Sequence, residues 1–128
     1  MSARQEVPGM PPLSDPERLQ CYRNALTNWR FEGYIRFTEL ADRWVRKELG
    51  GCTTRDVAQL MNDFVNGPTA GVIDEQKETR PEWSEHEYHY DLRFEIAGRR
   101  VYIETRLFYD DPQDPDDPVL YVVNIHDA

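Results

Sequence analysis

Residues 86–109 read HEYHYDLRFEIAGRRVYIETRLFY, and this stretch decides the fold. From Tyr88 to Ile96, apolar and polar side chains alternate, which is the period-two pattern of a strand with one buried face. After a break at AGRR, residues 97–100, the alternation resumes from Val101 to Leu107. Two successive runs of this kind predict an antiparallel hairpin with one apolar and one polar face.

The register of this hairpin decides which polar side chains become neighbours. The expected cross-strand pairs are Ile96 with Val101, Phe94 with Ile103, Leu92 with Thr105, Arg93 with Glu104, and Asp91 with Arg106. A last strand at 119–126 is expected to turn Tyr121, Val123 and Ile125 inward and to leave Leu120 on the polar face. Its expected partners are Leu107 for Tyr121, Glu104 for Asn124, and Tyr102 for His126.

Three amphipathic helices are expected before the strands, because apolar residues recur at helical spacing. Their expected starts are Ser14, which forms a capping box with Glu17, then Thr38, and then Thr53 with Asp56 three residues on. The first helix should end near residue 31, and the others before the glycines at 50 and 67.

The predicted fold is α+β, with three N-terminal helices packed on a four-stranded antiparallel β-meander. The strands are expected as a short edge strand near 72–73, two long strands at about 86–96 and 100–109, and the last strand after a loop at 110–118. Residues 14–128 should form a single domain. The proline-rich residues 1–13 are expected to be a flexible arm.

Length and composition limit the class of protein. A chain of 128 residues can bury a core without metal or disulfide staples. No apolar run approaches the roughly 20 residues of a membrane span, and the first 13 residues lack a secretion signal. Cys21 and Cys52 lack the spacing of a zinc or redox motif and are expected to be reduced thiols. A soluble, cytoplasmic protein is predicted.

The net charge of −9 is concentrated in the second part of the chain. Residues 1–71 hold nine acidic residues and nine lysines or arginines, whereas residues 72–128 hold fifteen and six. An acidic surface repels phosphate, so general binding to nucleic acid is disfavoured. The charge favours a basic protein partner.

A short helix motif carries a resemblance to a known family. The sequence has TELADR at 38–43, Gly50-Gly51, TTRDV at 53–57 and then the candidate strands. This order, from Arg36 onward, resembles the RelE-like (barnase/EndoU/colicin/RelE-type) superfold of small bacterial ribonuclease toxins, whose helix opens S/T-x-H-A-x-x-R. The family-like histidine falls on Leu40, and those toxins are usually basic. The resemblance therefore implies a retained scaffold whose ancestral chemistry is altered or lost.

The polar face of the predicted sheet contains parts that suit metal-independent RNA cleavage. In that hypothesis Glu104 is the general base, His126 the general acid, and Arg93 and Arg106 hold the phosphate. The alternative is that the same charges form cross-strand ion pairs on a solvated surface, contributing about 0.2–1 kcal/mol each.

Metal and cofactor binding are not expected. His86 and His89 lie three residues apart, so on one strand they would point to opposite faces, which disfavours a site shared with His126. The segment 110–118 offers five carboxylates but lacks the glycine and glutamate of a helix-loop-helix calcium site. It is interpreted as a solubilising loop or a patch for a basic partner. Its carboxylates are Asp110, Asp111, Asp114, Asp116 and Asp117.

Tyr102 and Phe108 complete the predicted partner surface, because aromatic side chains beside charges are typical of protein interfaces. The favoured function is a non-enzymatic acidic interaction module, antitoxin-like or inhibitor-like, that binds a basic or nucleic-acid-binding protein. The alternative is a metal-independent endoribonuclease of RelE-like type with a rearranged active site. A small-molecule sensor with a pocket between helices and sheet is a third hypothesis.

Overall fold

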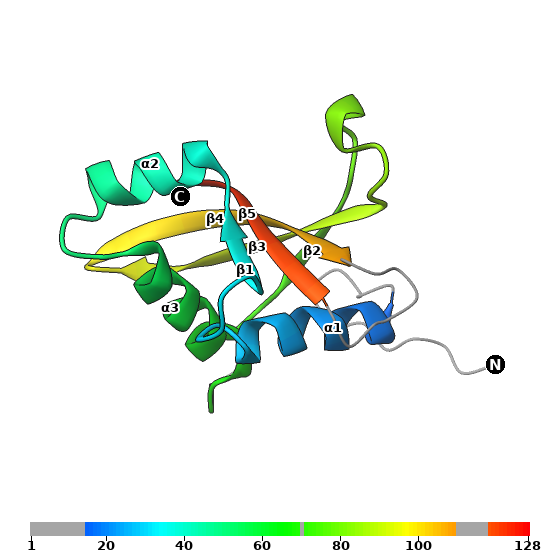
Figure 1. Cartoon of the computed structure of the whole chain (residues 1–128), viewed down its shortest axis with the longest axis horizontal. Coiled ribbons are helices and arrows are strands. Elements are labelled where there is room, and N and C mark those ends of the chain that lie inside the picture. The colour runs from blue at the N-terminus through cyan, green and yellow to red at the C-terminus, as the bar shows by residue number, and fades with distance from the viewer. Residues whose placement is uncertain (1–14, 70, 110–117) are drawn as a thin grey trace.

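The structure, a computed structural model, describes residues 15–69, 71–109 and 118–128. These residues form three α-helices, one 3-10 turn (η1) and one five-stranded sheet (Figure 1). In chain order the elements are α1 (Pro16–Thr27), β1 (Ile35–Phe37), α2 (Glu39–Glu48), α3 (Thr54–Asn66), β2 (Asp74–Lys77), η1 (Pro81–Trp83), β3 (Tyr88–Ile96), β4 (Arg99–Tyr109) and β5 (Pro118–Asp127). The expected arm at 1–13 lies outside the described residues.

The sheet is mixed, so the expected four-stranded antiparallel meander is wrong. Its strand order is β1-β5-β4-β3-β2, and β1 runs parallel to β5. The additional strand β1 has three residues, which is too short to show a period of two in the sequence. The expected edge strand exists as β2, but it is formed by the polar residues 74–77 instead of the apolar pair before them.

The helix starts follow local capping chemistry. The side chain of Asp15 accepts hydrogen bonds from the backbone N–H groups of Glu17 and Arg18, so Asp15 caps α1 in place of the expected Ser14. The expected caps Thr38 and Thr53 are confirmed, and α3 has the full capping box with Asp56. Helix α1 ends at residue 27, earlier than expected.

The β3–β4 register differs from the expected one by two residues. Ala97 and Gly98 both have positive φ, 52° and 79°, which is the geometry of a two-residue hairpin turn. This turn pairs Ile96 with Arg99 directly, instead of with Val101. A two-residue shift keeps every side chain on its expected face but changes its partner across the hairpin.

The β4–β5 pairing contains a register shift between Glu104 and Thr105. On one side of the shift the expected pairs Tyr102–His126 and Glu104–Asn124 are confirmed. On the other side Leu107 pairs with Leu120, not with Tyr121. The expectation that Leu120 faces outward is therefore wrong, because Leu120 is fully buried in the core.

One apolar core fills the space between the helices and one face of the sheet. All three helices contribute to it, and so do the inward-facing residues of β3, β4 and β5. Tyr22 on α1 reaches the sheet, where its hydroxyl and the Thr105 hydroxyl lie 2.9 Å apart. Within the described ranges, no helix is long and apolar enough to cross a membrane.

Candidate functional site

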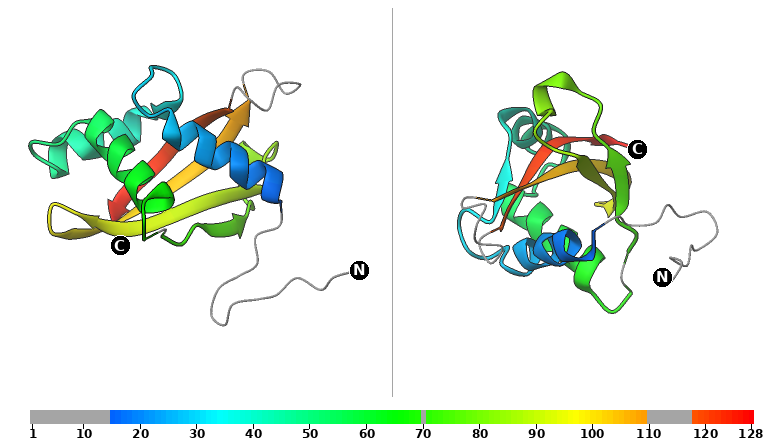
Figure 2. Two further views of the ribbon diagram at one scale, coloured as in Figure 1. Left: turned by 90° about the horizontal axis from the view of Figure 1, so that it is seen from below. Right: turned by 90° about the vertical axis from the view of Figure 1, so that its right-hand side faces the viewer.

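The face of the sheet that points away from the core carries most of the predicted site residues. Tyr102, Glu104, Arg106 and Phe108 alternate along β4 with residues of the core. The connection between β2 and β3, residues 78–87, includes η1 and projects at the top of the right-hand view in Figure 2. A backbone hydrogen bond from Glu78 N to the carbonyl oxygen of Glu87 closes it at its base. We call residues 78–87 the acidic connection.

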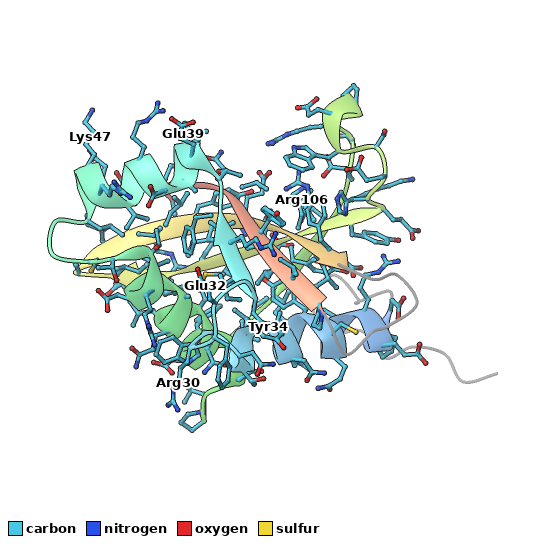
Figure 3. All side chains as sticks on the ribbon, in the orientation of Figure 1. Arg30, Glu32, Tyr34, Glu39, Lys47 and Arg106 are labelled. Carbon is cyan, nitrogen blue, oxygen red and sulfur yellow. The ribbon has the colours of Figure 1, made fainter. Side chains whose placement is uncertain are left out.

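Arg106 is the centre of the site and is completely buried, with a side chain exposure of 0 %. Its Nη2 lies 2.5 Å from Glu78 Oε2, and its Nη1 donates to Glu104 Oε2 at 2.7 Å. Both carboxylates are nearly as buried, at 2 % and 3 % exposure. Figure 3 shows Arg106 next to the acidic connection. The arginine therefore holds the connection against the sheet.

Glu104 binds a second arginine. Arg80, from the acidic connection, donates from Nη1 and Nη2 to the two Glu104 carboxylate oxygens at 3.0 and 3.1 Å. The Tyr102 hydroxyl adds a hydrogen bond of 3.2 Å. Burial favours a raised pKa for Glu104, but the hydrogen bond and charge of Arg106, followed by the charge of Arg80, outweigh it and hold the pKa below its usual value. Glu104 is therefore an anion with little tendency to take a proton.

Glu78 has the same electrostatic character. Burial favours a raised pKa, but the backbone N–H of Arg80 and the charge of Arg106 lower it. The two glutamates and two arginines of this group are thus paired with one another, two negative charges against two positive charges. Such an arrangement fixes structure, and Arg80 is the one member of the group whose side chain stays largely exposed, at 47 %.

A second buried group adjoins the first. His89 Nδ1 lies 2.8 Å from Asp91 Oδ1, and together with Glu104 these residues place one ligand atom each within 4.8 Å of one another. A histidine and two carboxylates fit a transition-metal ion by donor type. However, both Glu104 oxygens already accept hydrogen bonds from arginine, and the positive charge of those arginines opposes a cation. This group shares only His89 with the set His86, His89 and His126 that the sequence suggests and disfavours.

Aromatic rings cover the ion pairs on the side of the acidic connection. The Arg106 guanidinium lies 5.3 Å from the centroid of the Trp83 ring. Phe108 packs edge-on against the rings of His86 and Tyr121, with 4.3 Å and 4.7 Å between the respective ring centroids. Phe108 is therefore half-buried beneath the connection, which occupies much of the surface that was expected to be open to a partner.

The predicted catalytic residues do not form one open group. Arg93 pairs across the hairpin with Tyr102, so its expected place beside Glu104 is wrong. Its guanidinium binds Asp74 at 2.7 Å and lies 4.9 Å from the Tyr102 ring centroid. His126 is exposed and its ring stacks on that of Tyr102, with 4.7 Å between the two ring centroids. The predicted carboxylates between 110 and 117 lie outside the described residues.

Sequence reasoning missed the three residues that organise this site, namely Glu78, Arg80 and Trp83. They lie in a segment without periodicity, so no pattern assigned them to the face of the sheet. One signal was present: a tryptophan in an otherwise charged connection is a large apolar side chain that needs a surface to pack on. The outward-facing side chains of β4 provide that surface.

Comparisons of this chain with protein-family models, with curated proteins and with solved structures found no match. The resemblance to RelE-like toxins accordingly stays a prediction.

Proposed function

We propose that this protein is a non-enzymatic interaction module that presents the acidic connection to a basic protein. The observation that carries the proposal is the division of charge within residues 78–87. Glu78 points inward and pairs with the buried Arg106, whereas Arg80 pairs with Glu104 while 47 % of its own side chain stays exposed. The remaining charged residues are the exposed glutamates Glu82, Glu85 and Glu87. The outward side of the connection is therefore acidic.

The exposed carboxylates are weakly engaged within the protein itself. Glu87 lies 3.7 Å from Arg18, at the outer limit of an ion pair, and Glu85 lies 3.6 Å from His86. Glu82 forms no ion pair with a described cation. Negative charges in this state attract a cationic surface, chiefly by speeding up encounter and by selecting the partner.

The anchoring of the connection adds to this role. The Arg80–Glu104 and Arg106–Glu78 pairs and the Trp83 contact fix its conformation before a partner arrives. A preformed surface loses less conformational entropy on binding than a flexible loop does. Spaced carboxylates can imitate the phosphates that a nucleic-acid-binding protein recognises, so we propose an antitoxin-like or inhibitor-like role. The five aspartates of 110–117 would add negative charge to the same protein.

A charge-matched pair of variants tests the proposal with a fluorescent arginine-rich and lysine-rich peptide as the probe. The triple variant Glu82→Gln, Glu85→Gln, Glu87→Gln removes the exposed charges of the connection. The control Glu17→Gln, Glu39→Gln, Glu95→Gln removes three exposed charges elsewhere. Fluorescence anisotropy should show a loss of affinity of about tenfold or more in the first variant and about twofold or less in the control.

Affinity for the peptide should also fall as salt is raised, because exposed charges are screened over about 10 Å at 0.1 M ionic strength. Equal losses in the two triple variants would contradict the proposal, since net charge alone would then explain binding. Affinity that is unchanged between low and high salt would contradict it as well.

The ribonuclease hypothesis is a second proposal, and the exposure of His126 is the observation that favours it. Against it, Arg106 has no exposed surface, and the lowered pKa of Glu104 makes this residue a weak base. Incubation of the purified protein with single-stranded RNA in the presence of a chelator decides between the two. We expect no cleavage; cleavage that is lost in His126→Ala would establish the ribonuclease instead.

A further inference from the structure

A pocket of about 290 Å³ lies on a different part of the molecule from the acidic connection. It is formed by the segment after α1, by β1 and by the first residues of α3. Figure 3 labels Arg30, at this pocket, and Arg106 in different parts of the view. The volume is at the lower end of the range for small-molecule sites, which is about 300–1,000 Å³.

Two arginines that lack an ion-pair partner line this pocket. Seven other arginines of the described residues are paired with carboxylates. Arg30 and Arg55 pair with no described carboxylate, although the protein is strongly acidic. Thr54, the first residue of α3, also lines the pocket, but the Asp56 carboxylate of the capping box offsets the helix dipole at this end, so the positive potential comes from the two arginines. This pocket therefore attracts an anion.

The arginines are held in place by an aromatic ring. The guanidinium of Arg30 lies 5.4 Å from the Trp29 ring centroid and that of Arg55 lies 5.8 Å from it. Arg55 Nη2 also donates to the carbonyl oxygen of Arg30 at 3.4 Å. These contacts limit the motion of both cations, so less entropy is lost when they bind an anion.

The remaining wall is suited to a planar ring with hydroxyl groups. Phe31, also in the pocket lining, is 63 % exposed, which makes it the most exposed large apolar side chain of the described residues. Ile35 and Phe37 of β1 provide an apolar floor. Glu32 contributes the single carboxylate of the lining, which can accept hydrogen bonds from hydroxyl groups.

We propose that this pocket binds a nucleoside monophosphate. The base stacks on the exposed ring of Phe31, because both guanidinium groups already lie over Trp29. The phosphate is held by Arg30 and Arg55, and Glu32 accepts from the ribose hydroxyls. The charge of the lining, two positive and one negative, suits one phosphate better than a long polyphosphate.

Tryptophan fluorescence tests the site, because Trp29 lies within it. In the background Trp44→Phe, Trp83→Phe, Trp29 is the remaining tryptophan. Titration with adenosine monophosphate should give saturable quenching below about 5 mM, whereas adenosine and inorganic phosphate should bind about tenfold more weakly or not at all. Calorimetry on the unmodified protein gives a second measurement that does not depend on the two background substitutions.

The variants Arg55→Ala and Arg30→Ala should each lower the affinity for adenosine monophosphate about tenfold. The matched control is Arg43→Ala, which removes an exposed arginine on α2. Equal binding of adenosine and its monophosphate, or no saturable binding of any nucleoside monophosphate, would overturn the proposal. Tighter binding of a simple aromatic carboxylate such as nicotinate than of the nucleotide would overturn the assignment of the ligand class. Because calorimetry uses the protein with Trp83 in place, its outcomes do not depend on a change in the acidic connection.

Discussion

Replacement of Arg106 by methionine is the sharpest test of the buried ion pairs. Methionine replaces the apolar stem of arginine but has no guanidinium group, so it cannot bind Glu78 or Glu104. Two nearly inaccessible carboxylates then lose their shared cation. In the variant Arg80 still binds Glu104, whereas Glu78 loses the Arg106 guanidinium that it contacts in the wild type. The variant leaves a buried anion without an ion-pair partner.

Removal of one partner from a buried ion pair costs about 3–5 kcal/mol. That figure is a large part of the total stability of a domain, which is about 5–15 kcal/mol. The free energy of unfolding is measured by urea titration followed by circular dichroism. The matched control is Arg43→Met, which breaks an exposed pair with Glu39 on α2 and should cost about 0.5 kcal/mol or less.

The effect of Arg106→Met should depend on pH with a definite sign. In the wild type the pKa values of Glu78 and Glu104 are lowered, so the stability they contribute is present above about pH 4.3, the unfolded value, and is lost as pH falls through the folded values. Without Arg106, burial has the larger influence and the folded pKa of Glu78 rises. The difference between variant and wild type should therefore shrink on acidification.

Two results would refute this reasoning. The first is a decrease of less than about 1 kcal/mol in the free energy of unfolding of Arg106→Met at neutral pH, which would mean that the ion pairs are accessible to water. The second is a difference in stability that stays constant between neutral and acidic pH. A triple variant, Glu78→Gln, Glu104→Gln, Arg106→Met, should recover part of the loss, because it removes the buried charges that the single variant leaves behind.

Three further predictions concern single positions. Burial is the largest cause of the lowered pKa of His86, so the folded protein favours the neutral imidazole. The contribution of His86 to the free energy of unfolding should be complete above about pH 6.5 and should be lost as pH falls through the folded pKa. The variant His86→Phe should reduce this pH dependence in urea titrations. A side chain added in Gly67→Ala would clash with the backbone oxygen of Asp63 in α3 and should cost about 1–3 kcal/mol, whereas Gly50→Ala, with open space around it, should leave the melting temperature unchanged. Tyr22→Phe removes the hydrogen bond to Thr105 and should cost about 0.5–1.5 kcal/mol in urea, and an unchanged midpoint would show that this bond contributes nothing net.

The sequence predicted those elements whose signals are local. The caps Thr38 and Thr53 and the stop at Gly67 were visible because a helix end is fixed by a few neighbouring residues. The inward phase of β3 and β4 was correct for the same reason, since alternation is a property of each strand alone. Registers and neighbours were harder, because they depend on the turn at Ala97 and on the shift beside Glu104.

The candidate site was predicted only in part. Glu104 and Arg106 were correctly placed on the outer face, but their partners Glu78 and Arg80 come from a segment without a pattern. Burial of a charge depends on what covers it, and the cover here is a connection that no periodicity describes. Strand β1 was missed for a similar reason: its pairing with β5 is a long-range contact that no local signal indicates.

The parallel pairing of β1 with β5 has a consequence for how the chain is made and divided. Strand β5 lies between β1, which is synthesised early, and β4, which precedes it directly in the chain. In a nascent chain whose residues 118–127 are not yet synthesised, β1 and β4 each have an unpaired edge beside the apolar core. Such edges are prone to pair with strands of other chains. A fragment that stops after β4 should accordingly aggregate, whereas the chain that includes β5 should not.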